Sequence, residues 1–401
     1  MNGFSDDDKS ELRSHQPPRV VFAGGGTGGH VCPAIAVAEA LRELDPRAEV
    51  LFLGTGRGVE KRLLDSAGYP DIAVAPTHLR RSLRHLPMLA FASARGLARA
   101  FAAVGRFRPQ VCLGLGGYAQ VPGLIAARAY GVPFALFEPN AVVGRANRLL
   151  SGAAREVFIQ WPETTSGLKA PERAVITGTP IGKKALGLGD PELARARLGL
   201  PSQLPALLIV GGSQGARPLN DWAESVFAGV RRPPFSIIHL TGDKARTRSL
   251  KRTYDRAGVP NVVFTFHDRM GELYSASSVV LGRAGGATLA EVTAAGKPCV
   301  AVPYPHAVDD HQRANALALG DGGILCDQRE LGIGTYDRIV ELLSNPLERF
   351  ELTEKSRRRG HPDAAMAVAE RLLAIARGEP TPTLRPRVER AGSEQLSRGA
   401  F

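Results

Sequence analysis

The 401-residue chain has few cysteines and no long apolar run. Its four cysteines, Cys32, Cys112, Cys299 and Cys326, stand far apart, and no two have the C-x-x-C spacing of a zinc site or a redox motif. Their scarcity excludes a disulfide framework and indicates the reducing cytosol. The longest uncharged stretch, residues 109–127, contains several glycines and a second proline, which predicts strand, loop and helix rather than a membrane span.

Acidic residues are in the minority. The chain has 51 lysines and arginines against 39 aspartates and glutamates, a formal net charge of +12. This balance favours anionic partners, whether nucleotide phosphates, nucleic acid or an anionic membrane surface, although a basic surface without a specific partner gives the same count. No acidic residue at all occurs between Asp71 and Glu138.

The two ends of the chain are polar. Residues 1–17 lack the apolar core of a secretory signal, and residues 378–401 are rich in proline and arginine, so both are predicted to be disordered tails. The length between them exceeds one ordinary core. Three prolines within residues 161–180 predict a hinge, and we place the N-terminal domain at residues 18–170 and the C-terminal domain at residues 171–377.

Between the tails, short apolar or β-branched runs alternate with helix-length amphipathic segments. This alternation predicts parallel sheets connected by crossover helices. The predicted strands are Val20–Ala23, Val50–Leu53, Val111–Gly114, Phe134–Phe137, Val157–Ile159, Ala174–Thr177, Ala206–Val210, Ser236–Leu240, Val262–Phe266, Ser278–Leu281 and Cys299–Val302.

Each half of the chain opens on a strand, a glycine-rich turn and a helix start. Val20–Ala23 leads into GGGTGGH at residues 24–30, and Leu207–Val210 leads into GGSQGAR at residues 211–217. Backbone N–H groups and a helix N-terminus in such a turn can bind an anion or sugar hydroxyls. The repetition predicts an α/β fold of two Rossmann-like domains, with parallel sheets facing across a cleft.

The first glycine turn also has the spacing of a dinucleotide site. Gly24, Gly26 and Gly29 satisfy G-x-G-x-x-G, but a dinucleotide fold also needs an acidic residue at the end of the second strand, to bind the adenine ribose. Val50–Leu53 runs instead into the sequence GTGR, which weighs against NAD. His30, at the edge of the turn, is either a structural histidine or a base that meets a substrate hydroxyl.

The C-terminal half carries a denser set of polar residues. Gly285, Gly286 and Thr288 stand at a predicted helix start, with Glu291 one turn further on. The N–H groups of such a helix can bind a diphosphate, and the carboxylate can bind a ribose diol. The sequence DDHQ at residues 309–312 is either a capped helix start or part of a ligand site.

Five motifs occur in order: GGGTGGH at 24–30, GLGGYAQVP at 114–122, GGSQGAR at 211–217, RAGGATLAE at 283–291 and DDHQRANA at 309–316. Together they resemble the MurG family of bacterial GT-B glycosyltransferases, over residues 20–377. The resemblance implies a hexosyltransferase of peptidoglycan synthesis, cell shape and cell division. Its reaction is an inverting transfer of N-acetylglucosamine from UDP-N-acetylglucosamine to the C4 hydroxyl of lipid-linked N-acetylmuramoyl-pentapeptide, which converts lipid I into lipid II.

The resemblance also assigns site residues. It makes His30 the catalytic base, and it implies Ser213 near the diphosphate, Gln312 near the sugar and Glu291 at the ribose hydroxyls. It implies neither a metal nor a cofactor. The implied substrate-binding set is Thr27, Gly28, Gly29, Asn140, Ser213, Gly286, Ala287, Thr288, Glu291 and Gln312, with Lys183 and the main chain of His267 as further candidates.

The chain departs from the family pattern at three motifs. The family sequence GNPVR is GTPIG at residues 178–182, so the donor-binding arginine falls on Gly182 and the next residue, Lys183, is the candidate substitute. The family sequence HEQN is FEPN at residues 137–140, and RSGA is RAGG at residues 283–286. None of these departures removes the proposed base, but they change residues that the family uses to bind donor and acceptor.

The resemblance implies a peripheral protein on the cytoplasmic side of the bacterial inner membrane. Its partners would be proteins of cell-wall synthesis and cell division. A predicted helix supports membrane contact, because one of its faces is apolar and the opposite face is basic. The basic face suits anionic lipid or plain solvent, and the absence of interleaved aromatic residues disfavours nucleic acid. The apolar face holds Leu86, Leu89, Leu97, Phe101 and Val104, and the basic face holds Arg95, Arg99 and Arg106 with Met88 beside them.

Three other functions stay open. One is a GT-B transferase with a different lipid acceptor, and another is a nicotinamide-dependent oxidoreductase. The third is a non-catalytic module that binds a sugar nucleotide. The module is favoured if His30 and Glu291 lie far from a common cleft.

Overall fold

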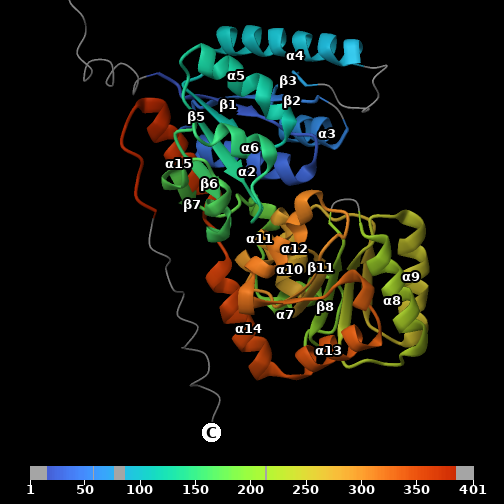
Figure 1. Ribbon diagram of the computed structural model, residues 1–401. Helices are drawn as coiled ribbons and strands as arrows, with labels where there is room; N and C mark the ends of the chain where they lie inside the picture. Colours follow the sequence, from blue (N-terminus) through green and yellow to red (C-terminus); the bar gives the residue numbers. More distant parts are fainter. Residues whose placement is uncertain (1–15, 57, 76–85, 213–214, 385–401) are drawn as a thin grey trace, which may run out of the picture.

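The computed structural model describes residues 16–56, 58–75, 86–212 and 215–384, with only the main chain over residues 86–91 (Figure 1). None of the helices in these ranges combines the length and apolarity that crossing a bilayer requires. The chain forms two α/β domains, each built on one parallel sheet.

The N-terminal domain is built on a sheet with the strand order β3-β2-β1-β4-β5-β6-β7. Its central strands are buried along their length, as their uninterrupted apolar sequences predict for a sheet covered on both faces. The strands are β1 (Arg19–Ala23), β2 (Glu49–Gly54), β3 (Asp71–Ala73), β4 (Val111–Gly114), β5 (Phe134–Glu138), β6 (Val157–Ile159) and β7 (Ala174–Ile176). The helices are α2 (Gly28–Leu44), α3 (Gly58–Ala67), α4 (Leu86–Phe107), α5 (Val121–Ala129) and α6 (Arg145–Leu150).

The C-terminal domain repeats the same order, β10-β9-β8-β11-β12-β13. The strands are β8 (Ala206–Val210), β9 (Ser236–Leu240), β10 (Asn261–Phe264), β11 (Val279–Arg283), β12 (Cys299–Val302) and β13 (Gly323–Leu325). The remaining helices of the described residues are α7 (Pro191–Arg197), α8 (Arg217–Gly229), α9 (Lys244–Ala257), α10 (Met270–Ala276), α11 (Gly286–Ala294), α12 (His311–Ala318), α13 (Ile333–Ser344), α14 (Pro346–Arg359) and α15 (Ala364–Arg377).

All eleven predicted strands are present, with ends that differ by no more than two residues. The edge strands β3 and β13 were not predicted, because each is only three residues long and half-buried. Strand order reverses between β1 and β4 and again between β8 and β11. Ligands of open α/β sheets bind at such reversals, and the glycine motifs follow these strands.

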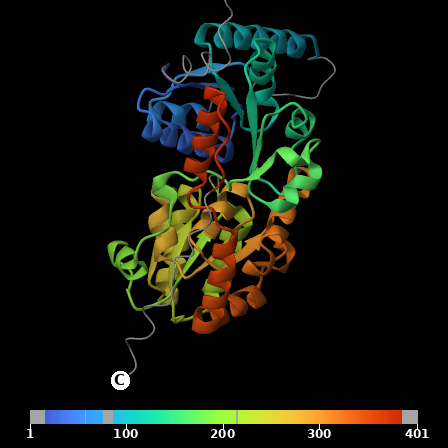
Figure 2. The same cartoon turned by 90° about the vertical axis from the view of Figure 1, so that its left-hand side faces the viewer.

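The division between the domains differs from the predicted boundary at residue 170. Strand β7 pairs in parallel with β6 and so belongs to the first sheet. Pro171 begins a short 3-10 turn that leads directly into β7, rather than a linker. The last helix, α15, returns to the N-terminal domain, where it packs on α2 (Figure 2).

A buried apolar face and a buried ion pair hold α15 on the N-terminal domain. Arg371 donates to both carboxylate oxygens of Glu156 at 2.7 and 2.6 Å, while Val368 and Leu372 beside it are fully buried. Arg371 also donates to Thr381 and Pro382, so the first residues of the predicted C-terminal tail are packed against the domain.

Candidate functional site

The first glycine turn is shaped by backbone angles that side chains disfavour. Gly24, Gly25 and Gly26 have φ values of 123°, 150° and 94°, which only glycine adopts readily. The turn connects β1 to α2, whose first residues, Gly28 and Gly29, lie beside it. This arrangement aims the start of α2 toward the C-terminal domain.

His30 lies in the first turn of α2. Its Nδ1 is 3.0 Å from the hydroxyl of Thr27, and a methyl group built on Gly116 would lie 3.4 Å from its Nε2. Burial lowers the pKa of His30 below its usual value, His311 lowers it further, and the charge of Glu60 opposes both. The imidazole is therefore neutral at pH 7, the form in which it can accept a proton.

Glu60 is a residue of this loop that the sequence did not single out. Only 1% of it is exposed, and its carboxylate accepts hydrogen bonds from the backbone of Gly26, Thr55 and Gly56. A single glutamate at the start of a predicted helix gives no pattern to detect. Its burial follows only from the packing of α3 against the loops after β1 and β2.

The start of α11 forms the opposite wall. Gly285 precedes the helix in an extended conformation, and a methyl group built on Gly286 would lie 2.7 Å from the carbonyl oxygen of Pro139, so the helix abuts the end of β5 closely. The predicted backbone residues Ala287 and Thr288 form its first turn. Their N–H groups are unpaired within the helix and can bind an anion.

Glu291 lies one turn further along α11. The hydroxyl of Tyr274 donates to its carboxylate at 2.9 Å, and burial raises its pKa to about 7. Burial, together with the charge of Glu291, raises the pKa of Cys32 in α2 to about 11. The helices α2 and α11 contact each other, so the segments that carry His30 and Glu291 lie close together although they belong to different domains.

Two asparagines connect the domains beside this cleft. The amide of Asn315 donates to the side chain of Asn140 at 3.0 Å and accepts from the backbone N–H of Ala141 at 2.8 Å. Asn140 itself donates to the buried carboxylate of Glu138. Asn140, which was predicted to bind the sugar donor, therefore takes part in a contact between the domains.

The start of α12 reaches the cleft through a strained turn. Asp309 and Asp310 have φ values of 52° and 50°, in the left-handed region, and Asp309 pairs with Arg145 of the other domain at 3.1 Å. Gln312 follows, and its side chain accepts from the backbone N–H of Tyr304 at 2.9 Å. Strain of this kind typically marks functional segments.

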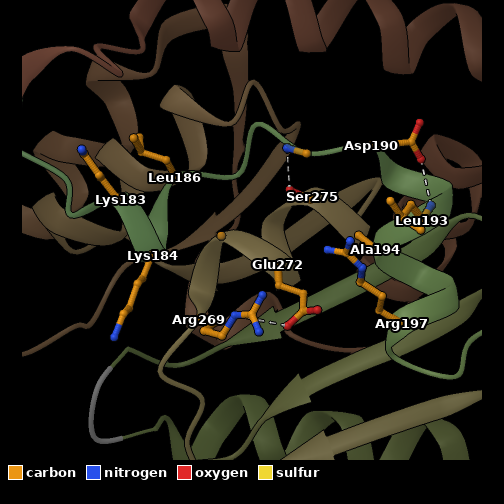
Figure 3. Close-up of a pocket in the computed structure, with 12 residues that line it drawn as sticks. Lys183, Lys184, Leu186, Asp190, Leu193, Ala194, Arg197, Arg269, Glu272 and Ser275 are labelled. Carbon is orange, nitrogen blue, oxygen red and sulfur yellow. Dashed lines mark hydrogen bonds and ion pairs between the residues drawn. The ribbon is translucent and has the colours of Figure 1, made fainter.

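Lys183 is directed away from His30. Its ammonium group lies 2.5 Å from Glu43, near the far end of α2 and about 20 Å along the helix from His30. A donor contact would require Lys183 to leave this ion pair. Beside it opens a cavity of roughly 380 Å³, whose walls include Arg197, Arg269 and Glu272 (Figure 3).

Two further candidates differ in what the structure describes. His267 packs on Phe264, with ring centroids 4.8 Å apart, and its Nε2 lies 3.6 Å from Glu272, so its ring faces the protein. That position agrees with a main-chain role. Ser213 lies outside the described residues.

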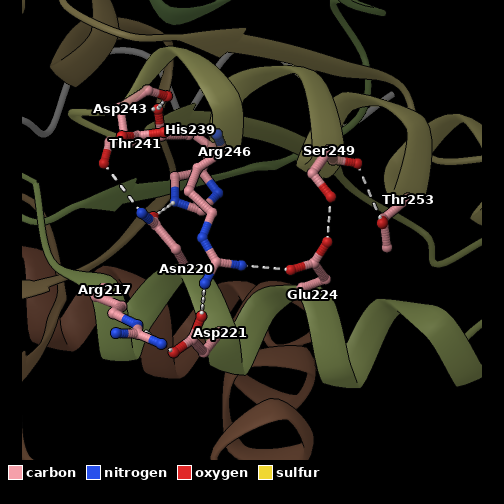
Figure 4. A network of polar contacts seen from close by, with 10 residues as sticks. All are labelled: Arg217, Asn220, Asp221, Glu224, His239, Thr241, Asp243, Arg246, Ser249 and Thr253. Atoms are coloured by element: carbon pink, nitrogen blue, oxygen red, sulfur yellow. Dashed lines mark hydrogen bonds and ion pairs between the residues drawn. The ribbon is translucent and has the colours of Figure 1, made fainter.

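Gly215 of the second glycine turn packs against a buried polar network, part of which is drawn in Figure 4. Gly215 packs against the carbonyl of Thr241, which accepts from the amide of Asn220 at 3.0 Å. The side-chain oxygen of Asn220 lies 3.0 Å from Nε2 of His239, and Nδ1 of His239 lies 2.7 Å from the hydroxyl of Tyr254. Burial lowers the pKa of His239 to about 3, so this histidine is neutral and structural.

The comparisons with known proteins agree with this geometry. Residues 20–159 match the glycosyltransferase family 28 N-terminal domain, and residues 206–368 match the family 28 C-terminal domain. A relative from Nitratidesulfovibrio vulgaris is 37% identical over 90% of this chain and 99% of its own length. It is named UDP-N-acetylglucosamine–N-acetylmuramyl-(pentapeptide) pyrophosphoryl-undecaprenol N-acetylglucosamine transferase. The crystal structure of Acinetobacter baumannii MurG matches 89% of this chain and 99% of its own, with a TM-score of 0.71 and 29% identity.

The chain belongs to the MurG family. A relative of the same name from Geobacter sulfurreducens is 35% identical over 90% of this chain and all of its own length. The MurG-type fold is shared more widely, since a putative UDP-N-acetylglucosamine 2-epimerase from Listeria monocytogenes matches with a TM-score of 0.64 at 15% identity, over 92% of this chain and 99% of its own. Membership of the MurG family makes the chain a glycosyltransferase and confirms the predicted GT-B fold.

Proposed function

We infer that this chain transfers N-acetylglucosamine from UDP-N-acetylglucosamine to N-acetylmuramyl-(pentapeptide) pyrophosphoryl-undecaprenol, converting lipid I into lipid II in peptidoglycan synthesis. Relatives that are 34–37% identical to this chain are named after this activity. The observation that carries the inference is the contact between α2 and α11, which brings the segments of His30 and Glu291 together from the two domains. A non-catalytic module requires neither residue there.

The acceptor side of the reaction depends on His30. Its neutral imidazole removes the proton of the acceptor C4 hydroxyl as that oxygen attacks C1 of N-acetylglucosamine. The new C–O bond forms on one face of C1 while the bond to the diphosphate oxygen breaks on the other, with its electron pair leaving on UDP. A single displacement of this kind inverts the anomeric carbon.

The donor side depends on α11. The N–H groups of Gly286, Ala287 and Thr288 stabilise the charge that develops on the departing UDP, as helix N-termini do for anions. The carboxylate of Glu291 accepts hydrogen bonds from the ribose hydroxyls. The other proposed donor contacts are made by Thr27, Gly28, Gly29, Asn140, Ser213, Gln312 and the main chain of His267, whereas Lys183 stays paired with Glu43.

Replacing the base tests the assignment of His30. His30→Ala should lower kcat by roughly 100-fold or more, the usual contribution of a general base, while the KM for UDP-N-acetylglucosamine changes little. The measurement is UDP release and disaccharide formation with a lipid I analogue. A near-normal kcat in this variant removes His30 as the base, and turnover by the wild-type protein only with another acceptor contradicts the proposed reaction.

The raised pKa of Glu291 predicts a pH-dependent affinity for the donor. Below a pH of about 7 the carboxyl is protonated and binds the ribose hydroxyls less strongly, so the donor KM should rise as pH falls through this value. Glu291→Gln should raise the donor KM about 10-fold at pH 8, since a hydrogen bond to a charged group is worth about 1.5 kcal/mol or more. The same variant should abolish the pH dependence, and a persisting dependence assigns it to another group.

We also propose that α4 binds the cytoplasmic face of the bacterial inner membrane, peripherally. The helix forms the outer layer of the N-terminal domain (Figure 1). Arg95, Arg99 and Arg106 are exposed along it, whereas Val104 is buried and Phe101 packs against Tyr130. Anionic lipid attracts such a basic face. Proteins of cell-wall synthesis and cell division are the proposed partners there.

The predicted apolar and basic faces of α4 agree with the burial of the side chains that the structure describes. Leu97 and Phe101 are half-buried, and Val104 is buried. The side chains of Leu86, Met88 and Leu89 lie outside the described residues. Membrane contact therefore rests on the three arginines.

Removing the three positive charges tests the membrane proposal. The triple variant Arg95→Gln, Arg99→Gln and Arg106→Gln should bind vesicles of phosphatidylglycerol and phosphatidylcholine about 100-fold more weakly, at about 1 kcal/mol for each arginine. Co-sedimentation measures the affinity.

A matched control exists in the C-terminal domain. Arg248, Arg252 and Arg256 are likewise exposed along one helix, α9. Their triple glutamine variant should bind the vesicles like the wild-type protein. Equal losses in the two variants contradict a specific role for α4.

A further inference from the structure

We propose that Glu60 is a positioning residue for the transfer. Its buried carboxylate occupies the position at which the first glycine turn would otherwise bind an anion, and it holds that turn in the conformation that presents His30. The proposal rests on the function inferred above and adds a residue to it. In dinucleotide-binding folds the N–H groups of this turn bind a phosphate of the cofactor. In this chain the protein supplies the anion itself.

The carboxylate binds two neighbouring loops at once. Oε2 accepts from the backbone N–H of Gly26 at 2.5 Å and from the hydroxyl of Thr55 at 2.7 Å. Oε1 accepts from the backbone N–H of Thr55 at 2.9 Å and of Gly56 at 3.1 Å. Four donors therefore converge on one buried carboxylate from the loops after β1 and β2, which compensates its loss of hydration.

Two glycines leave the space that this carboxylate occupies. A methyl group built on Gly25 would lie 2.6 Å from Oε2, and one built on Gly54 would overlap the carboxylate. Gly25 and Gly54 are thus required by an internal anion rather than by a ligand phosphate.

Glu60 also acts on His30 through its charge. The described charged or titratable groups that act on the imidazole are Glu60 from α3, which raises its pKa, and His311 from α12, which lowers it. As His30 takes the acceptor proton it becomes a cation, and a nearby carboxylate stabilises a cation more than a neutral ring. Glu60 therefore favours the protonated product of base catalysis as well as the loop conformation.

Glu60→Gln tests the proposal, since it keeps the shape but removes the charge and presents an N–H₂ group to the N–H donors. We expect kcat to fall about 10-fold or more, because part of the roughly 100-fold effect of a general base is lost. The donor KM should rise by a smaller factor, because Thr27, Gly28 and Gly29 of the same turn are proposed donor contacts. The acidic limb of the kcat–pH profile should move to lower pH, because losing the carboxylate lowers the pKa of His30. A kcat within 2-fold of wild type with an unmoved limb overturns the proposal.

Two comparisons separate positioning from loss of stability. Glu156→Gln alters another buried glutamate of the same domain, the partner of Arg371, and should lower thermal stability without moving the acidic limb. Thr55→Val removes one bond to Glu60 but leaves its charge, so kcat should fall several-fold with the limb unmoved, and Thr55→Ser should restore the rate. If Glu60→Gln does not fold, an unaltered kcat in Thr55→Val overturns the proposal. Failure of the proposed function itself appears differently, as absent turnover in the wild-type protein.

Discussion

The acceptor half of the cleft depends on a carboxylate bound by main-chain N–H groups. Glu60 holds the loops after β1 and β2 together, and Glu138 holds the turn after β5 in the same way, by accepting from Gly144 and Asn140. A buried carboxylate is costly unless donors surround it, so each glutamate fixes the turn that supplies its donors. The two turns fixed in this way carry His30 and Asn140, which are two of the proposed site residues.

The C-terminal domain, which carries the proposed donor site, repeats the topology of the N-terminal domain. Both sheets reverse strand order at their centres, so both domains gather glycine-rich turns at the carboxyl ends of two adjacent strands. Asn315 and Asp309 then connect the halves through Asn140, Ala141 and Arg145. These contacts bring α11 close to α2, so that one helix carries the proposed base and the other carries the N–H groups proposed to bind the leaving diphosphate.

Much of this arrangement could be predicted from the sequence, because local patterns determine it. Buried parallel strands are uninterrupted apolar runs, and glycine turns between strand and helix are visible as motifs, so strands, fold and repeated domains follow. The boundary at residue 170 was wrong because prolines mark turns as well as linkers, and Pro171 starts the turn before β7. The return of α15 to the first domain rests on contacts between residues far apart in the sequence, such as that of Arg371 with Glu156, 215 residues away. No local pattern reports such a contact.

Residues of the site could be predicted from the sequence only where they stand in motifs. His30 and Glu291 stand in motifs, whereas Glu60 stands in none, and Lys183 was chosen because it follows Gly182 in the sequence rather than by geometry. The structure gives Lys183 a partner, Glu43, at the far end of α2. A motif therefore identifies the residues near a turn, but their contacts decide which of them face the ligand.

The most direct test of this account is a crystal structure of the protein with UDP-N-acetylglucosamine bound. The account predicts the diphosphate at the start of α11, against the N–H groups of residues 286–288, with the carboxylate of Glu60 still bonded to Gly26. A diphosphate bound at Gly26, with Glu60 displaced from the first glycine turn, would contradict it.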